Sequence, residues 1–245
     1  LKERYPRAGT SNVTVKLGIM EVASGQTKWI NLGDNKDIYL PRVSWVPNSS
    51  GIFYQIQNRE QNRLDLIYAD AKTANKRTIL IEHSKTWINL NHGLKLIKNG
   101  KEFLWQSERT GFNHLYHYKS DGKLINQLTD GDWVVNGPVK LANDEIYFSA
   151  NADDYLERHL YKVPLISDKQ LRPEKVSIRA GWHTINFPDE GNNYIDRFSS
   201  ADQPTQVSIH NLSGERELWI EENKINSDHP YSAYLGQHIK PEFGK

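Results

Sequence analysis

The sequence predicts an all-β protein built as a partial β-propeller, and three observations favour this fold. Aromatic residues are abundant, with seven Trp, twelve Tyr and seven Phe against a single Met. Aromatic residues are enriched in β-strands, because their side chains pack well on a pleated, half-buried surface. Short apolar runs alternate with turns rich in Gly, Asn and Asp, which is typical of antiparallel strands. The same succession of runs also recurs about every 47 residues, close to the length of a four-stranded propeller blade.

Each repeat begins with two short apolar strands that are separated by a tight turn. The first strand is expected at residues 43–45, 94–96, 139–141 and 184–187. The second is expected at residues 52–54, 103–105, 146–148 and 194–195. The turns between them contain Asn, Asp or Gly, as in Lys98-Asn99-Gly100, because these residues tolerate positive φ angles. Trp105 lies in one of the second strands, and we expect its side chain to be buried between blades.

The third and fourth strands complete each repeat. Third strands are expected at residues 17–20, 66–68, 115–118, 160–163 and 207–210, and fourth strands at positions such as 78–80 and 124–125. The resulting blades span roughly residues 1–40 (partial), 43–90, 91–136, 138–182 and 183–223, with 224–245 as a linker. One four-stranded sheet cannot bury both of its faces, so blades stack on one another. A β-sandwich would have similar turns between its strands, but it would not explain why the strand pattern recurs about every 47 residues.

Charge and composition exclude several functional classes. The 31 Lys and Arg are balanced by 30 Asp and Glu and are interspersed with them, so no nucleic-acid partner is expected. No apolar run approaches the ~18 residues that a membrane helix needs. The absence of Cys excludes disulfides, thiolate metal sites and cysteine nucleophiles. Because the chain begins at Leu1 without a signal pattern, we expect it to be a fragment or a processed product.

The histidines do not predict a metal site, and no cofactor is expected. His114 and His117 are three residues apart in a predicted strand, so their side chains point to opposite faces and cannot converge on one ion. We expect His114 to make hydrogen bonds between blades and His117 to be exposed.

Two stretches of this sequence carry a family resemblance. The first is Tyr5-Pro6-Arg7-Ala8-Gly9 with the strand that follows it, and the second is the string from Ser107 to Tyr116 with Leu128-Thr129-Asp130-Gly131-Asp132-Trp133 behind it. Their order and spacing resemble the propeller of the dipeptidyl peptidase IV branch of the prolyl oligopeptidase family. The tail at residues 218–223 is similar to the last blade of that propeller. The resemblance implies the later half of an eight-bladed ring.

The resemblance also implies a function for the parent protein. Members of this family release N-terminal Xaa-Pro or Xaa-Ala dipeptides with a Ser–Asp–His triad in a hydrolase domain that follows the propeller. Their nucleophile lies in a Gly-x-Ser-x-Gly turn, and no Ser of this chain is flanked in that way. We therefore expect the chain alone not to be a peptidase. The implied partners are the hydrolase domain and peptide substrates, and the implied location is the periplasm or the exterior of the cell.

Two groups of candidate site residues follow from the resemblance. A loop that corresponds to a substrate-facing segment in relatives contains Trp87, Asn89, Asn91 and His92. The most distinctive string is expected to have a structural role, and it contains Ser107, Glu108, Arg109, Gly111 and His114.

The alternative function is a stand-alone periplasmic propeller that binds or scaffolds other molecules. An incomplete ring would leave blade faces bare, and large exposed apolar patches favour association. We therefore expect the chain to associate with itself.

Overall fold

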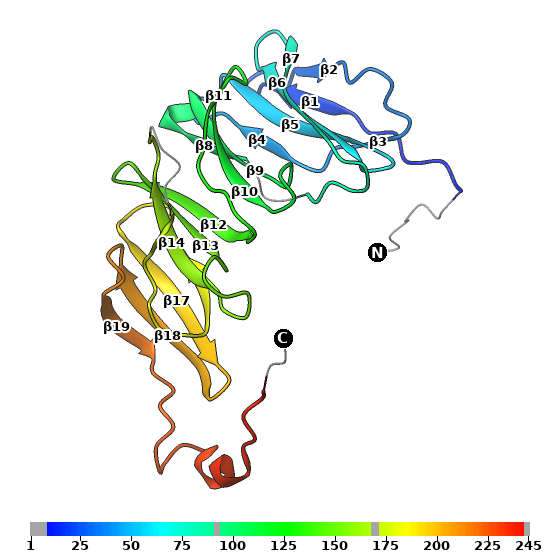
Figure 1. Ribbon diagram of the computed structural model, residues 1–245. Coiled ribbons are helices and arrows are strands. Elements are labelled where there is room, and N and C mark those ends of the chain that lie inside the picture. The colour runs from blue at the N-terminus through cyan, green and yellow to red at the C-terminus, as the bar shows by residue number, and fades with distance from the viewer. Residues whose placement is uncertain (1–8, 91–93, 168–171, 243–245) are drawn as a thin grey trace. The chain divides into compact units, whose positions relative to one another are not determined.

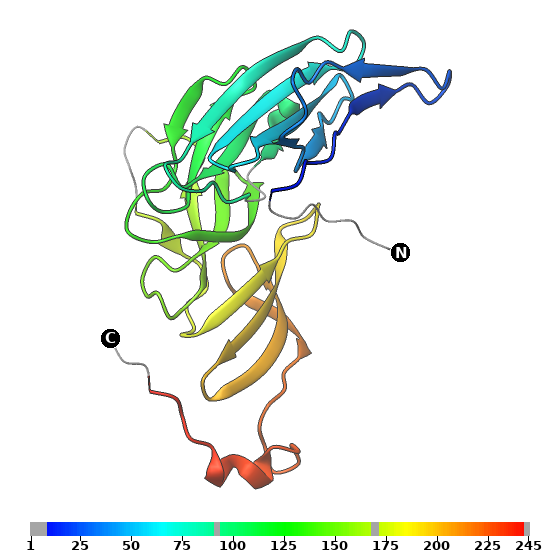
Figure 2. The same cartoon turned by 90° about the vertical axis from the view of Figure 1, so that its right-hand side faces the viewer.

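The structure is a computed structural model that describes residues 9–90, 94–167 and 172–242. It is all-β, as the sequence predicts, and its strands form antiparallel sheets from consecutive segments of the chain (Figures 1 and 2). The first sheet contains the hairpin of β1 (Leu17–Met20) and β2 (Thr27–Ile30). The other sheets of the described residues contain four or five strands each.

The larger sheets follow in chain order. The five-stranded sheet contains β3 (Ile38–Tyr39), β4 (Val43–Trp45), β5 (Gly51–Asn58), β6 (Arg63–Asp70) and β7 (Lys76–His83). The next contains β8 (Lys95–Ile97), β9 (Glu102–Ser107), β10 (His114–Lys119) and β11 (Leu124–Gln127). The third contains β12 (Val135–Ala142), β13 (Glu145–Ala150), β14 (His159–Pro164) and β15 (Glu174–Lys175). The last contains β16 (Trp182–Asn186), β17 (Asn193–Ser200), β18 (Gln203–Asn211) and β19 (Arg216–Glu221).

Each four-stranded sheet is an up-and-down meander in which consecutive strands are neighbours. This is the architecture of a propeller blade. In the five-stranded sheet, β3 and β4 both pair with β5. Together they take the place of the first strand of a blade, interrupted between Tyr39 and Val43. Short 3-10 turns lie at Lys98–Gly100 and Ser232–Gln237. The predicted fold class is confirmed.

The described residues divide into two compact units. The N-terminal unit comprises the described residues up to Thr110 with Tyr116–Ile125, and the C-terminal unit comprises Gly111–Leu115 with the described residues from Asn126 onward. Each unit has its own core, and each is described by itself.

Aromatic side chains from successive strands fill the core of the N-terminal unit. Phe103 stacks on Tyr118 with ring centroids 5.2 Å apart, and Phe53 lies 6.1 Å from Phe103. Trp105 belongs to the same cluster and is only 2% exposed, so its predicted burial is confirmed. Strands β5 and β9 are buried on both faces, which explains why their sequences are apolar runs and not alternating patterns.

The core of the C-terminal unit joins its two sheets in the same way. Tyr147 and Leu160 from one sheet pack with Ile185 and Tyr194 from the other. Figure 1 shows β17, β18 and β19 side by side in the last sheet.

A histidine holds the start of the third strand in two sheets, and we call these arrangements the His114 clamp and the His159 clamp. Nδ1 of His114 lies 3.1 Å from Oγ1 of Thr129, and the same oxygen accepts the Leu115 N–H at 2.9 Å. Nδ1 of His159 lies 3.1 Å from Oγ of Ser177, which accepts the Leu160 N–H at 2.9 Å. Each hydroxyl thus ties the segment after the fourth strand to the third strand.

The second ring nitrogen fixes the tautomer in each clamp. Nε2 of His114 donates to the carbonyl of Gly131 at 2.8 Å, and Nε2 of His159 faces the Glu157 carboxylate at 2.7 Å. A carbonyl and an ionised carboxylate can only accept, so Nε2 carries the proton and Nδ1 accepts from the hydroxyl.

The expectation that His117 is exposed is wrong. His117 is 0% exposed, and its Nε2 lies 2.7 Å from a carboxylate oxygen of Glu102. His114 and His117 do point to different partners, but both faces of β10 are covered, so alternation does not separate a wet face from a dry one.

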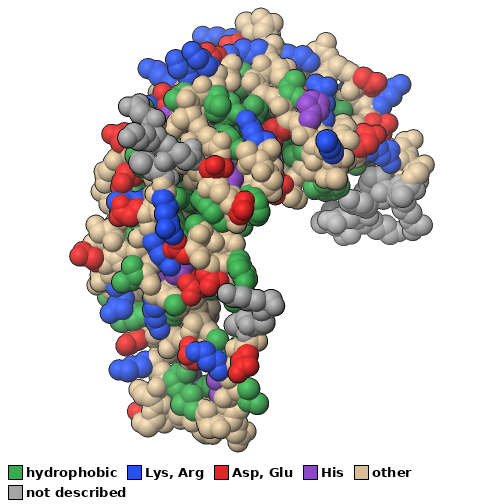
Figure 3. All heavy atoms as spheres, in the orientation of Figure 1, with side chains coloured by type: hydrophobic (Ala, Val, Ile, Leu, Met, Phe, Trp, Pro, Cys, Tyr) green, Lys and Arg blue, Asp and Glu red, His purple; other side chains and the backbone are tan. Residues whose placement is uncertain are grey.

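The surface carries mixed charge, and Figure 3 shows basic and acidic side chains interspersed on the face in view. Among the described residues, no helix is long and apolar enough to cross a membrane. The same residues contain no group of three or more His, Cys, Asp or Glu that is placed to hold a metal ion.

Candidate functional site

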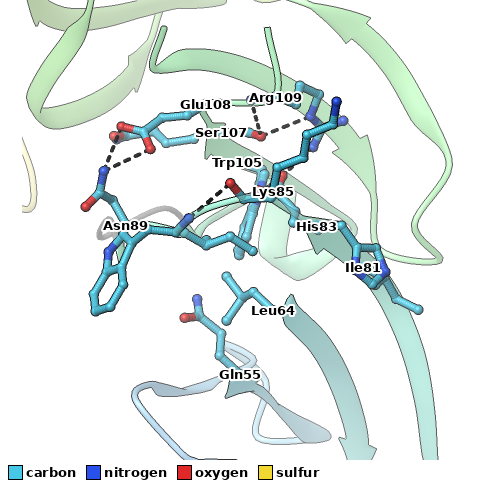
Figure 4. A pocket seen from close by; sticks show the side chains of 15 residues that line it. Gln55, Leu64, Ile81, His83, Lys85, Asn89, Trp105, Ser107, Glu108 and Arg109 are labelled. Carbon is cyan, nitrogen blue, oxygen red and sulfur yellow. Dashed lines mark hydrogen bonds and ion pairs between the residues drawn. The ribbon is translucent and has the colours of Figure 1, made fainter. Parts of the chain in front are cut away.

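A cavity of about 420 Å³ lies in the N-terminal unit beside β7 and β9. Its walls come from β7, the loop that follows it, the end of β9 and the start of the next loop (Figure 4). Both groups of residues singled out in the sequence contribute to it. Trp87 and Asn89 line it from one loop, and Ser107, Glu108 and Arg109 line it from the other.

The loop after β7 is held in place by its backbone. Oγ of Ser84 accepts the N–H of Trp87 at 3.2 Å, which forms a tight turn. Further along, the Ile88 N–H donates to Gln61 O at 2.8 Å, and Nε2 of Gln57 donates to Ile88 O at 3.1 Å. Ile88 is buried in the core, whereas Trp87 is 52% exposed. The loop therefore presents its indole at the edge of the cavity.

Asn89 joins this loop to the loop after β9. Its Nδ2 donates to Oε1 and Oε2 of Glu108 at 3.0 and 2.9 Å, as the dashed lines in Figure 4 show. Asn91 and His92, which belong to the same predicted substrate-facing loop, lie outside the described residues.

Arg109 is the most connected side chain of the site. Its Nε donates to Oγ of Ser107 at 3.0 Å, its Nη1 to the hydroxyl of Tyr118 at 2.6 Å, and its Nη2 to Oε1 of Glu82 at 2.6 Å. The guanidinium also lies 4.2 Å from the ring centroid of Tyr116. Burial on its own lowers the pKa of Arg109, but the bonds to Tyr118 and Glu82 outweigh it and raise that pKa overall. These contacts connect β7, the loop after β9 and β10.

The other two residues of the distinctive string do not reach the cavity. Gly111 adopts a φ of 104° in the turn before β10, a conformation that favours glycine. His114 forms the clamp described above, in the C-terminal unit.

Several lining residues escaped the sequence reasoning, among them Gln55 and Glu82. Gln55 is 3% exposed, and its Oε1 has no hydrogen-bond partner among the described residues. Glu82 accepts both from Arg109 and from Nε1 of Trp105, the latter at 2.8 Å. A signal was present for Gln55, because this polar residue interrupts the apolar run of β5. Buried polar side chains that lack a partner are rare and call for an explanation.

The two serine hydroxyls that line the cavity are engaged in local hydrogen bonds. Oγ of Ser84 accepts backbone N–H groups and Oγ of Ser107 accepts from Arg109, so neither hydroxyl faces a histidine base in the described residues. An activated nucleophile needs such a base within hydrogen-bond reach. The lining also contains an amide, carboxylates, cations and an exposed indole, and groups of these kinds can orient a bound ligand.

A chain of Ser177, His159 and Glu157 has the atom order of a nucleophile, a base and an acid. It is nevertheless part of the His159 clamp. His159 is 0% and Ser177 6% exposed, and Oγ of Ser177 already accepts the Leu160 N–H. Burial lowers the pKa of the His159 imidazole, which keeps it neutral. The three side chains thus serve the hydrogen bonds of the sheet.

Comparisons with known proteins agree with this fold. The family model of the dipeptidyl peptidase IV N-terminal region matches residues 1–205. The chain is 27% identical over 224 residues to dipeptidyl peptidase 4 of Trichophyton rubrum, covering 84% of this chain and 28% of that protein. It is 26% identical over 242 residues to the probable dipeptidyl-aminopeptidase B of Coccidioides posadasii, covering 91% and 26%. The chain thus spans less than a third of the length of these relatives.

Two solved structures are similar to the chain. The crystal structure of Porphyromonas gingivalis dipeptidyl peptidase 4 matches with a TM-score of 0.82 and 28% identity, over 90% of this chain and 31% of that one. A putative dipeptidyl aminopeptidase IV from Bacteroides ovatus matches with a TM-score of 0.78 and 23% identity, over 90% and 34%.

Proposed function

Because the chain belongs to the family of the dipeptidyl peptidase IV N-terminal region, we propose that it is the non-catalytic propeller portion of a serine-type dipeptidyl peptidase. In this role it supports a hydrolase domain and controls the access of peptides to it. The parent protein releases Xaa-Pro or Xaa-Ala dipeptides from the N-termini of peptides, in the periplasm or outside the cell. The observation that carries the proposal is the fold likeness to a dipeptidyl peptidase 4 over 90% of the chain.

The cavity supplies the peptide contact in this proposal. Trp87 offers an exposed apolar surface, and Asn89 and Glu108 offer hydrogen-bonding groups beside it. The alternative of a stand-alone scaffold is not favoured, since the relatives and structures named above are dipeptidyl peptidases or aminopeptidases. The contact with a hydrolase domain and self-association of the chain are proposals of the same kind.

The first prediction is that the chain itself does not hydrolyse Gly-Pro p-nitroanilide above the buffer rate. Its cavity lacks a nucleophile–base pair in the part that the structure describes. The coding sequence downstream of Lys245 should contain a Gly-x-Ser-x-Gly turn, and the longer protein should cleave the substrate. Turnover by the chain itself that a fluorophosphonate blocks would contradict the proposal, as would a stop codon directly after Lys245.

The second prediction concerns peptide binding at the cavity. In the longer protein, Trp87→Ala should raise KM for a peptide that begins Gly-Pro by about tenfold and leave kcat nearly unchanged, because the indole is a binding contact only. Trp29→Ala is the matched control, since Trp29 is 63% exposed but lies in the β1–β2 hairpin. Equal KM values for the two variants would exclude the cavity as a substrate contact.

A further inference from the structure

Arg158 has an unusual position at the start of β14 in the C-terminal unit. Its backbone is fixed on both sides, because its N–H donates to Gly181 O at 3.1 Å and its carbonyl accepts the His183 N–H at 2.9 Å. These two bonds form a parallel bridge between Arg158 and Trp182. The direction of the Arg158 side chain is therefore set by the sheet.

The side chain reaches an irregular part of β12. The register between β12 and β13 shifts between Asn136 and Val139, so the chain bulges there. Gly137, inside this bulge, has a φ of 76°, and a Cβ on it would overlap Nη2 of Arg158. Only glycine combines this backbone angle with room for the guanidinium. Bulges of this kind are enriched beside functional sites.

The guanidinium has no anionic partner among the described residues. Its Nε is buried and makes no hydrogen bond there, and no ion pair between described residues includes Arg158. The guanidinium lies over the Trp182 ring, 5.7 Å from its centroid. Burial lowers the pKa of Arg158. By contrast, the exposed Arg172 in the same unit pairs with Asp153 at 2.8 Å. Arg158 as a whole is partly exposed, but a buried N–H without a partner is costly, so it calls for an explanation, and a ligand would provide one.

A second polar group without a partner lies at the same place. Ser149 is 0% exposed, and its Oγ makes no hydrogen bond with the described residues. Its Cβ is 3.7 Å from the point where a Cβ on Gly137 would sit, and Nη2 of Arg158 is 2.4 Å from the same point. Two unused donors, one of them cationic, thus meet beside the bulge.

The chemistry of these donors selects the ligand. A guanidinium fork binds planar, two-oxygen anions in a bidentate manner, and a hydroxyl can donate to the same group. Glu157, the residue before Arg158 in the sequence, faces Nε2 of His159 at 2.7 Å. The Trp182 ring is 46% exposed and offers an apolar surface to the carbon atoms of a ligand. An organic carboxylate satisfies all three groups.

We propose that Arg158 and Ser149 form a binding site for a carboxylate, with Trp182 against the carbon chain that carries it. Two sources share this chemistry, namely the side chain of an acidic residue and the C-terminus of a peptide. The site belongs to the chain itself and does not depend on the proposed role in a dipeptidyl peptidase.

The test is a titration of the chain with small probes, followed through the indole N–H signal of Trp182 in nuclear magnetic resonance spectra. The probes are N-acetyl-glutamic acid amide, which carries only a side-chain carboxylate, and N-acetyl-alanine, which carries only a terminal one. N-acetyl-glutamine amide is the neutral control, and sodium sulfate tests for an unselective anion site. We expect saturable binding of at least one carboxylate in the millimolar range, with the neutral probe silent and sulfate weaker.

Variants identify the groups that bind. Arg158→Gln should weaken binding about tenfold or more, and Ser149→Ala about threefold, as expected for a charged and a neutral donor. Arg158→Lys should keep part of the affinity, because it retains the charge but not the fork. Arg172→Gln is the matched control and should bind like the parent chain. Urea unfolding of each variant verifies that it is folded. The proposal is overturned if neither carboxylate saturates, if sulfate binds as well as both, or if folded Arg158→Gln binds normally.

Discussion

The His114 and His159 clamps form the same hydrogen bonds in two sheets, yet the residues before them differ. Both clamps start a His-Leu-Tyr segment, and their hydroxyl bonds have equal lengths of 3.1 and 2.9 Å. Asn113 precedes the first clamp, and its Nδ2 donates to Val135 O at 2.7 Å. Arg158 precedes the second clamp, and its side chain makes no such bond within the part of the chain that the structure describes.

The comparison shows which group before the clamp histidine the sheet requires, the backbone carbonyl or the side chain. The backbone bond across to the next sheet is present in both cases, from Val135 N to Asn113 O at 2.8 Å and from His183 N to Arg158 O at 2.9 Å. The side chain at this position is therefore not required to close the fold. In the first case it adds a further bond to the next strand, and in the second it is available to a ligand.

The largest effect should come from removing a clamp histidine. His114→Leu should lower the free energy of unfolding by about 3 kcal/mol, because it removes the acceptor of the Thr129 hydroxyl proton and the donor to the Gly131 carbonyl. His159→Leu should cost less, about 2 kcal/mol, since the Glu157 side chain is 25% exposed and can turn to water.

Reversible urea unfolding measures both values. Both histidines lie in the C-terminal unit, so the same transition reports on them. The exposed His83, at the end of β7, provides a control whose replacement by Leu should change little. A cost below about 1 kcal/mol for either clamp histidine would show that its hydrogen bonds are not structural.

The pH dependence of stability gives a smaller effect that distinguishes the clamps. Burial, together with the nearby charges of Lys175 and His183, lowers the folded-state pKa of His159 below 6.5, although the bond to Glu157 opposes this. As the pH falls below about 6.5, His159 takes up a proton in the unfolded chain before it does so in the folded chain. The free energy of unfolding therefore decreases as the pH falls. The loss is at most about 1.4 kcal/mol per pH unit for one proton.

His159→Leu should therefore flatten the fall in unfolding free energy between pH 6.5 and the lower folded-state pKa. The measurement is a series of urea titrations across this range. An unchanged slope in the variant would show that His159 does not titrate on unfolding.

The sequence predicted the elements better than the sites. Apolar runs such as Phe103–Trp105 became buried central strands, because aromatic side chains on both faces of a strand can be covered only in stacked sheets. The prediction that His117 is exposed was wrong because both faces of its strand are covered. Alternation predicts a wet face only when one side of the sheet meets solvent.

The cavity required the folded structure. Asn89 and Glu108 were singled out separately, but their contact joins loops that follow two different strands. Gln55 enters the same cavity from a third strand. Similarly, the local sequence does not indicate that Nε of Arg158 is unpaired among the described residues, because that depends on how distant segments pack around it. Pairings between distant segments decide these features.

The most direct test of the comparison is the matched pair Asn113→Ala and Arg158→Ala in reversible urea unfolding at neutral pH. Asn113→Ala removes a buried bond to Val135 O and should lower the free energy of unfolding by about 1–2 kcal/mol. Arg158→Ala removes a side chain without an ionic partner among the described residues, and should change it by less than about 0.5 kcal/mol or raise it slightly. If Arg158→Ala destabilises the chain as much as Asn113→Ala does, Arg158 is a structural residue and the account is contradicted.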